Sequence, residues 1–148
     1  MDSEPKFKFF VPVKVRYQDT DQQGHVYFGT YYTFFDEGVE GYLEAIGYSY
    51  REMLADKIDF IFAESHCTYK SSVKWPEVLN VYARIGHIGR RSLRYEFEIW
   101  ADVDGRLVAT GYIAVVTVDR DTFTPQPVPD ALRRAVANYE GDLPSEDN

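Results

Sequence analysis

The chain has 148 residues, enough for one domain, and its formal net charge of −8 argues against nucleic acid as a partner, because phosphate binding needs a basic surface. Cys67 is the single cysteine, which excludes an intramolecular disulfide and a cysteine metal cluster and fits a reducing, cytoplasmic setting. The first residues lack the apolar stretch of a signal peptide, and no apolar run approaches the roughly 20 residues of a membrane span, so we expect no membrane association.

Residues 7–17 alternate between apolar side chains on one face and mostly basic side chains on the other. This period of two predicts a half-buried strand. Residues 18–24 are polar and contain two Asp and a Gly, which predicts a loop.

Residues 30–46 change to a helical period. One stripe is apolar and the opposite row is acidic: Tyr31, Phe34, Phe35, Val39, Tyr42, Leu43 and Ile46 against Asp36, Glu40 and Glu44. We expect Thr30 to be the N-cap and Gly47 to follow the helix end. Gly38 and Gly41 each cost a helix about 1 kcal/mol relative to Ala, which close packing on a sheet would explain.

The remaining chain predicts short elements in quick succession. A short second helix is expected at 49–56, followed by strands at about 59–73, 77–88, 92–103 and 106–119, and by a last helix at 130–139. The strand at 106–119 is almost continuously apolar, so we place it centrally in the sheet. Residues 1–139 therefore predict a single domain, and the acidic residues 140–148 predict a disordered tail.

This order gives one strand, one long helix and then four antiparallel strands. A single helix with one apolar stripe and a single sheet must cover each other. The predicted class is α+β, with one sheet packed on one long helix.

The segment Asp19 to Tyr27 is the densest in chemically active side chains, and it lies between the first strand and the long helix. A helix N-terminus carries partial positive charge and free N–H groups. A carboxylate beside it can act as base or nucleophile while those groups hold an oxyanion. On residue types alone, however, a polar loop whose Asp residues make turn hydrogen bonds is the favoured interpretation.

The same segment resembles the signature of a known family. Tyr17-Gln18-Asp19-Thr20-Asp21-Gln22-Gln23-Gly24-His25-Val26-Tyr27, followed by Tyr31, Phe34 and Gly47, resembles the motif of the 4-hydroxybenzoyl-CoA thioesterase family. The resemblance covers about residues 9–120. It implies a hotdog fold, in which a five-stranded antiparallel sheet wraps around one long central helix, and hydrolysis of a short-chain or aromatic acyl-CoA. It also implies a homodimer or homotetramer, no metal, and no cofactor besides the CoA of the substrate.

The resemblance assigns roles to individual residues. Asp21 matches the family's catalytic Asp, and Phe28 matches the residue whose backbone N–H polarises the thioester carbonyl. Gly24, His25 and Tyr27 belong to the substrate-binding loop. A related branch carries His at the position of Phe28, so an auxiliary His is not available in this chain.

A second match is the stretch Gly89-Arg90-Arg91-Ser92, between two predicted strands. A similar basic stretch ending in Ser contacts the CoA nucleotide in the family, so Arg90, Arg91 and Ser92 are predicted to bind substrate. Arginine forks suit the phosphates of CoA. Without the resemblance, a solvated hairpin would be the favoured interpretation.

Three functions remain in competition. In thioester hydrolysis, Asp21 either attacks the carbonyl carbon or deprotonates water, and the sequence does not choose between these roles. A hydratase or dehydratase would act on acyl thioesters through a His and a carboxylate. A non-catalytic acyl-CoA-binding module would need no carboxylate beside the thioester.

Overall fold

The computed structural model describes residues 4–141 and the backbone of 145–146. The elements along the chain are β1 (Phe9–Lys14), the short 3₁₀ helix Tyr17–Asp19, α1 (Thr30–Ile46), α2 (Tyr50–Ala55), β2 (Ile58–Tyr69), β3 (Val78–Gly89), β4 (Ser92–Ala101), β5 (Leu107–Asp119), α3 (Asp130–Glu140) and β6 (Ser145–Glu146). No helix in this described part is long and apolar enough to cross a membrane.

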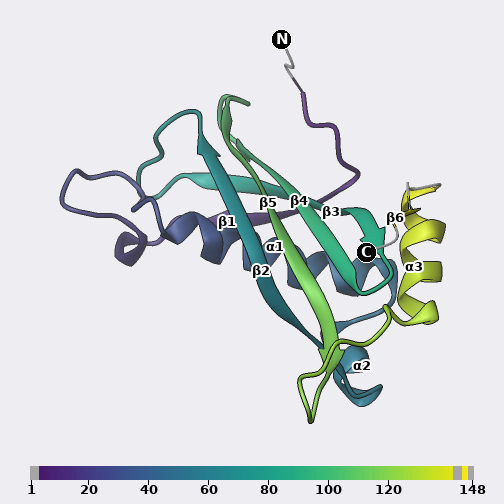
Figure 1. The fold of residues 1–148 in the computed structure, drawn as a ribbon. Helices are drawn as coiled ribbons and strands as arrows, with labels where there is room; N and C mark the ends of the chain where they lie inside the picture. The colour runs from purple at the N-terminus through teal and green to yellow at the C-terminus, as the bar shows by residue number, and fades with distance from the viewer. Residues whose placement is uncertain (1–3, 142–144, 147–148) are drawn as a thin grey trace.

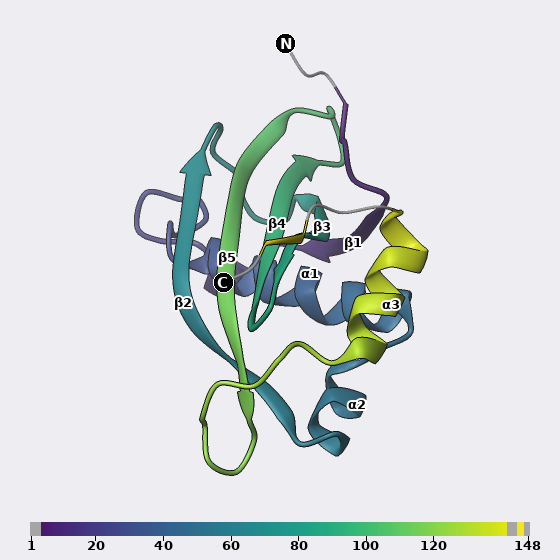
Figure 2. The ribbon, with the colours of Figure 1, turned by 45° about the vertical axis from the view of Figure 1, so that its right-hand side comes forward.

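The five long strands form one antiparallel sheet in the order β1-β3-β4-β5-β2, and α1 lies across one face of it (Figures 1 and 2). The predicted α+β hotdog arrangement is therefore confirmed. β5 is an interior strand, as expected, although β4 occupies the middle of the sheet. The residues that the tail prediction concerns lie partly outside the described range, while Ser145–Glu146 pair in parallel with the end of β3.

The apolar stripe of α1 packs against the sheet at very short range. A Cβ built on Gly38 would lie 3.1 Å from a methyl carbon of Val81, and one built on Gly41 would lie 2.8 Å from the ring of Phe9. These two glycines therefore let the helix backbone approach β3 and β1. This close packing was predicted, because glycine inside a helix is otherwise unfavourable. Phe35, which also belongs to α1, is fully buried against the sheet.

The ends of several elements differ from the prediction. The strand expected at 59–73 ends at Tyr69, because the Lys70 and Ser71 N–H groups both turn to the Val108 carbonyl, and the strand expected at 92–103 ends at Ala101, where the turn to β5 begins.

The first strand spans Phe9–Lys14 only, because the chain turns into a 3₁₀ helix at Tyr17. Gly29, not Thr30, is the N-cap of α1 and provides no side-chain cap, since Thr30 is already helical. The Thr30 hydroxyl instead lies 3.5 Å from the carbonyl oxygen of Asp19. Gly47 ends the helix in the left-handed conformation, as predicted, with φ of +86°.

Gly111 in β5 gives a direct test of this packing. A Cβ at this position would lie 2.5 Å from the backbone carbonyl oxygen of His66 and 2.8 Å from the ring of Phe35. We expect Gly111→Ala to lower the free energy of unfolding by about 1–3 kcal/mol, since overpacking forces the sheet or the ring to shift. Urea denaturation measures this change, and an unchanged midpoint would show that the helix and sheet can separate without strain.

Candidate active site

The motif loop between β1 and α1 is built around Asp19. This carboxylate is 3% exposed and accepts hydrogen bonds from the backbone N–H and the guanidinium of Arg16, with Nη2 to Oδ1 at 2.9 Å. The Asp19 carbonyl also accepts the Tyr27 N–H at 2.9 Å. Asp19 therefore closes the loop, and its carboxylate is occupied by structural contacts.

Asp21 is held in a tight turn that leaves part of its carboxylate free. The Gln23 N–H donates to Asp21 Oδ1 at 2.9 Å, and the Gly24 N–H donates to the Asp21 carbonyl at 2.9 Å. Gly24 has φ of +83°, a conformation that side chains with a Cβ rarely adopt. The Asp21 N–H bonds the His25 carbonyl at 2.9 Å and closes the turn. Oδ2 accepts no hydrogen bond from the described residues and is available for chemistry.

Phe28 lies just before the first turn of α1. Its carbonyl oxygen accepts the hydroxyl of Tyr69 at 2.8 Å, while its N–H donates to no acceptor in the described chain. Burial, together with Cys67, raises the pKa of Tyr69 to about 12, so its hydroxyl remains a donor at neutral pH. An N–H left free near a helix N-terminus is suited to bind an oxyanion.

One pocket of about 340 Å³ brings the catalytic candidates together. Its lining is Asp21, Gln23, His25, Val26, Phe28, Tyr31, Tyr69, Lys70, Ser71 and Ser72. Three predicted site residues, Asp21, His25 and Phe28, therefore face the same space. Tyr27 does not line it; its ring packs on that of Phe28 at 4.7 Å. The wall formed by residues 69–72 was not predicted, because the sequence placed these residues inside the strand expected at 59–73 and they carry no motif.

Arg90 and Arg91 lie at the opposite end of the sheet from Asp21. The first residue of β3, Val78, pairs with Lys14 beside the motif loop, and Arg90 follows the last residue of β3. At about 3.3 Å per strand residue, the separation is on the order of 35 Å. Within one chain, therefore, Arg90, Arg91 and Ser92 do not join the pocket of Asp21.

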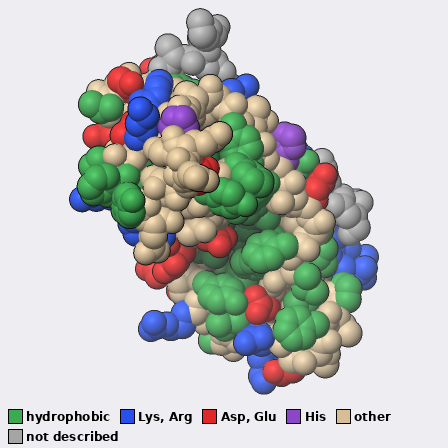
Figure 3. Space-filling model, turned by 90° about the vertical axis from the view of Figure 1, so that its left-hand side faces the viewer, with side chains coloured by type: hydrophobic (Ala, Val, Ile, Leu, Met, Phe, Trp, Pro, Cys, Tyr) green, Lys and Arg blue, Asp and Glu red, His purple; other side chains and the backbone are tan. Residues whose placement is uncertain are grey.

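A separate groove lies between α1 and β2. It consists of two hollows of about 480 and 720 Å³ that share Asp36, Phe62 and Ile113. Burial and the nearby Glu37 raise the pKa of Asp36. Tyr95 lines the larger hollow, and its buried hydroxyl has no hydrogen-bond partner in the described part of the chain. Figure 3 shows one side of the molecule, on which hydrophobic clusters lie with acidic side chains between them.

Comparison with known proteins decides the family. The profile of the thioesterase-like superfamily matches residues 15–136. The chain belongs to the thioesterase-like superfamily. The family predicted from the motif is thus confirmed, and the match includes the whole motif loop, α1 and the strands β2 to β5.

Individual relatives of this thioesterase-like protein agree. Acyl-CoA thioester hydrolase YbgC of Escherichia coli O6:H1 is 24% identical over 121 residues, which cover 82% of this chain and 90% of that protein. DHNA-CoA thioesterase from Staphylococcus aureus has a TM-score of 0.81 at 26% identity, covering 93% and 97% of the two chains. SAV2348 from Staphylococcus aureus, solved in complex with CoA, has a TM-score of 0.81 over 95% and 90%. At 20% identity, that last likeness shows the fold alone.

Proposed function

We propose that this thioesterase-like protein hydrolyses a short-chain or aromatic acyl-CoA to the free acid and CoA. The observation that carries the proposal is one pocket containing both a carboxylate with a free oxygen, Asp21 Oδ2, and a free N–H, that of Phe28. These are the two groups that thioester hydrolysis needs, one to supply or activate a nucleophile and one to hold the oxyanion. Release of free CoA thiol from acyl-CoA by the purified protein tests it.

Two reaction mechanisms are consistent with the Asp21 carboxylate and the Phe28 N–H in one pocket. In the first, Asp21 Oδ2 attacks the carbonyl carbon, the Phe28 N–H binds the tetrahedral oxyanion, and CoA leaves as thiolate and takes a proton from solvent. Water then cleaves the mixed anhydride. In the second, Asp21 takes a proton from water as that water attacks the carbonyl, and the proton passes to the departing thiolate.

The assembly that would complete the site follows from the free edge of β2. This strand has 12 residues, contains no proline, and exposes Ile61 and Phe62. The other edge strand, β1, has 6 residues and contains Pro12, which cannot donate a ladder hydrogen bond. A long, apolar open edge invites pairing with another chain. We infer a dimer in which the two β2 strands pair antiparallel about a two-fold axis.

This pairing accounts for the distance between Asp21 and the arginines. β2 begins near the β3–β4 turn, since the Arg120 N–H bonds the Lys57 carbonyl and the Thr117 N–H bonds the Arg91 carbonyl. It ends at Tyr69, in the wall of the Asp21 pocket. Antiparallel pairing therefore brings Arg90 and Arg91 of the partner subunit to the Asp21 end. The acyl group would lie in the groove between α1 and β2, and the CoA phosphates would reach the partner. Two such dimers are expected to form a tetramer.

Replacing Arg90 and Arg91 together with Ala tests the nucleotide contact. We expect KM to rise much more than kcat falls, because contacts remote from the thioester bind the ground state and the transition state alike. Steady-state kinetics on one acyl-CoA measure both constants, with Arg84→Ala on the outer face of the sheet as control. If KM stays at the wild-type value, these two arginines do not belong to the site.

A further inference from the structure

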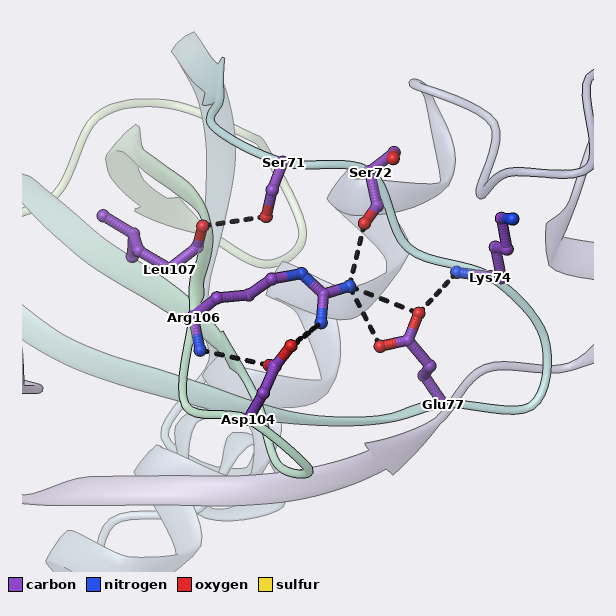
Figure 4. A network of polar contacts seen from close by, with 7 residues as sticks. All are labelled: Ser71, Ser72, Lys74, Glu77, Asp104, Arg106 and Leu107. Atoms are coloured by element: carbon purple, nitrogen blue, oxygen red, sulfur yellow. Dashed lines mark hydrogen bonds and ion pairs between the residues drawn. The ribbon is translucent and has the colours of Figure 1, made fainter.

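Arg106 forms the centre of a polar network that includes Ser72, Glu77 and Asp104 (Figure 4). Its Nη1 contacts Asp104 Oδ2 at 2.9 Å, and its Nη2 contacts Glu77 Oε1 at 2.9 Å. The same Nη2 donates to the Ser72 carbonyl at 2.9 Å. One guanidinium therefore joins the β4–β5 hairpin to both ends of the 72–77 segment. Its side chain lines none of the pocket around Asp21.

The connection between β2 and β3, residues 70–77, is held by this network and by hydrogen bonds to the start of β5. The Lys70 N–H donates to the Val108 carbonyl at 2.8 Å, and the Ser71 hydroxyl donates to the Leu107 carbonyl at 2.9 Å. At the other end, the Lys74 N–H donates to Glu77 Oε2 at 2.9 Å. Lys70, Ser71 and Ser72 form one wall of the catalytic pocket. Arg106 thus holds that wall through the Ser72 carbonyl.

The same segment holds the motif loop. The Val26 N–H donates to the Val73 carbonyl at 2.8 Å, and both side chains are buried. Val26 lies between His25 and Tyr27, in the short stretch that separates Asp21 from Phe28. The Val15 N–H also donates to the Glu77 carbonyl at 2.9 Å, where β1 leads into the loop. A displacement of residues 72–77 would therefore reach Asp21 and Phe28 through Val73.

We propose that Arg106 is a positioning residue of the thioesterase site, which clamps residues 72–77 to Glu77 and thereby fixes the Asp21 carboxylate relative to the Phe28 N–H. The expected effect on kcat rests on the proposed function, whereas the expected loosening of residues 72–77 does not. The clamp requires the several N–H donors of a planar guanidinium group, because Arg106 bonds two carboxylates and a carbonyl at once. A lysine at this position would supply the charge from one nitrogen only.

Arg106→Met, Glu77→Gln and the double variant test the clamp. We expect each single change to lower kcat by about 10- to 100-fold while KM changes little, because misplacement near the chemistry penalises the transition state. The double variant should be no slower than the slower single variant, since both changes release the same segment. Arg106→Lys should recover only part of the loss. A folded Arg106→Met enzyme with wild-type kcat, or strictly additive losses, would overturn the proposal.

Arg84→Met is the matched control. The Arg84–Glu96 pair resembles the Arg106–Glu77 pair, with a 2.8 Å contact and side-chain exposures of 37% and 20% against 2.9 Å, 31% and 23%. It lies between β3 and β4, away from the pocket, so we expect Arg84→Met to keep wild-type kcat. An equal loss of kcat in this control would assign the Arg106 effect to general destabilisation.

Hydrogen exchange separates this proposal from the proposed function. Arg106→Met should exchange the Val26 and Lys74 amides faster than wild type, whether or not the protein hydrolyses acyl-CoA. Arg84→Met should leave both amides unchanged. Unaltered exchange at Val26 in Arg106→Met would overturn the clamp even if the enzyme is active. Faster exchange in Arg106→Met, combined with a wild-type protein that hydrolyses no acyl-CoA, would reject only the proposed function.

Discussion

Asp21→Asn is expected to bind acyl-CoA but to lose roughly 10²-fold or more in kcat, the scale expected when a general base or nucleophile is removed. The change keeps the size of the side chain, and Asn Oδ1 can still accept the Gln23 N–H that holds the turn. The negative charge is lost, so the group can neither attack the thioester nor take a proton from water. Steady-state release of CoA measures kcat, and calorimetric binding of a non-hydrolysable acyl-CoA measures retained affinity.

The structure also determines the right control for this experiment. Asp19→Asn would remove the charge of a buried carboxylate that accepts three hydrogen bonds from Arg16, so we expect it to lower stability rather than to report on chemistry. Asp119 is better matched, because its Oδ1 accepts the Asp121 N–H at 2.9 Å in a similar turn at the other end of the sheet. Asp119→Asn should keep wild-type kcat. Near-normal turnover in Asp21→Asn would remove Asp21 from the mechanism.

Ile61→Glu is expected to convert the assembly to monomers and to abolish most of the activity. Ile61 is 44% exposed on the open edge strand β2, lines neither hollow of the groove proposed for the acyl group, and would place a carboxylate from each subunit in the β2–β2 interface. Like charges at a paired edge are destabilising, and the monomer would lack the arginines that the partner supplies. Light scattering measures the mass, and kcat/KM on the same preparation measures the loss.

Phe10→Glu is the matched control for the choice of edge. Phe10 is 44% exposed on the other edge strand, β1, where its ring packs on Tyr82 at 4.9 Å. We expect this variant to remain an active oligomer. If Phe10→Glu yields monomers and Ile61→Glu does not, the dimer uses β1. A fully active Ile61→Glu monomer would mean that the site is complete in one chain.

The fold could be predicted largely from local patterns. Local periodicity indicates which face each element buries. The apolar face of residues 9–15 and the stripe from Tyr31 to Ile46 do pack on the core, whereas Tyr17, beyond the end of β1, is 75% exposed. The ends of elements were less predictable, since they depend on contacts with distant parts of the chain. Thr30, for example, has the side chain of an N-cap, but the preceding loop turns into the helix one residue earlier, at Gly29.

The site was predictable only where it is continuous in sequence. Asp21, His25 and Phe28 meet in one pocket because a single turn and the start of α1 place them there. Tyr69, Ser71 and Ser72 join them through the fold of the sheet, which brings the end of β2 beside the loop. Arg106 acts at still longer range, through bonds to Ser72 and Glu77, and neither its residue type nor its neighbours in the chain indicate that contact.

The most direct test of the proposed function is catalytic release of free thiol from a panel of short-chain and aromatic acyl-CoAs by the wild-type protein. The proposal predicts many turnovers per subunit on at least one of them, with one carboxylic acid formed per CoA, and a loss of roughly 10²-fold or more in Asp21→Asn. Tight binding of acyl-CoA without thiol release across the panel would contradict it, and would instead indicate a binding module built on the same fold.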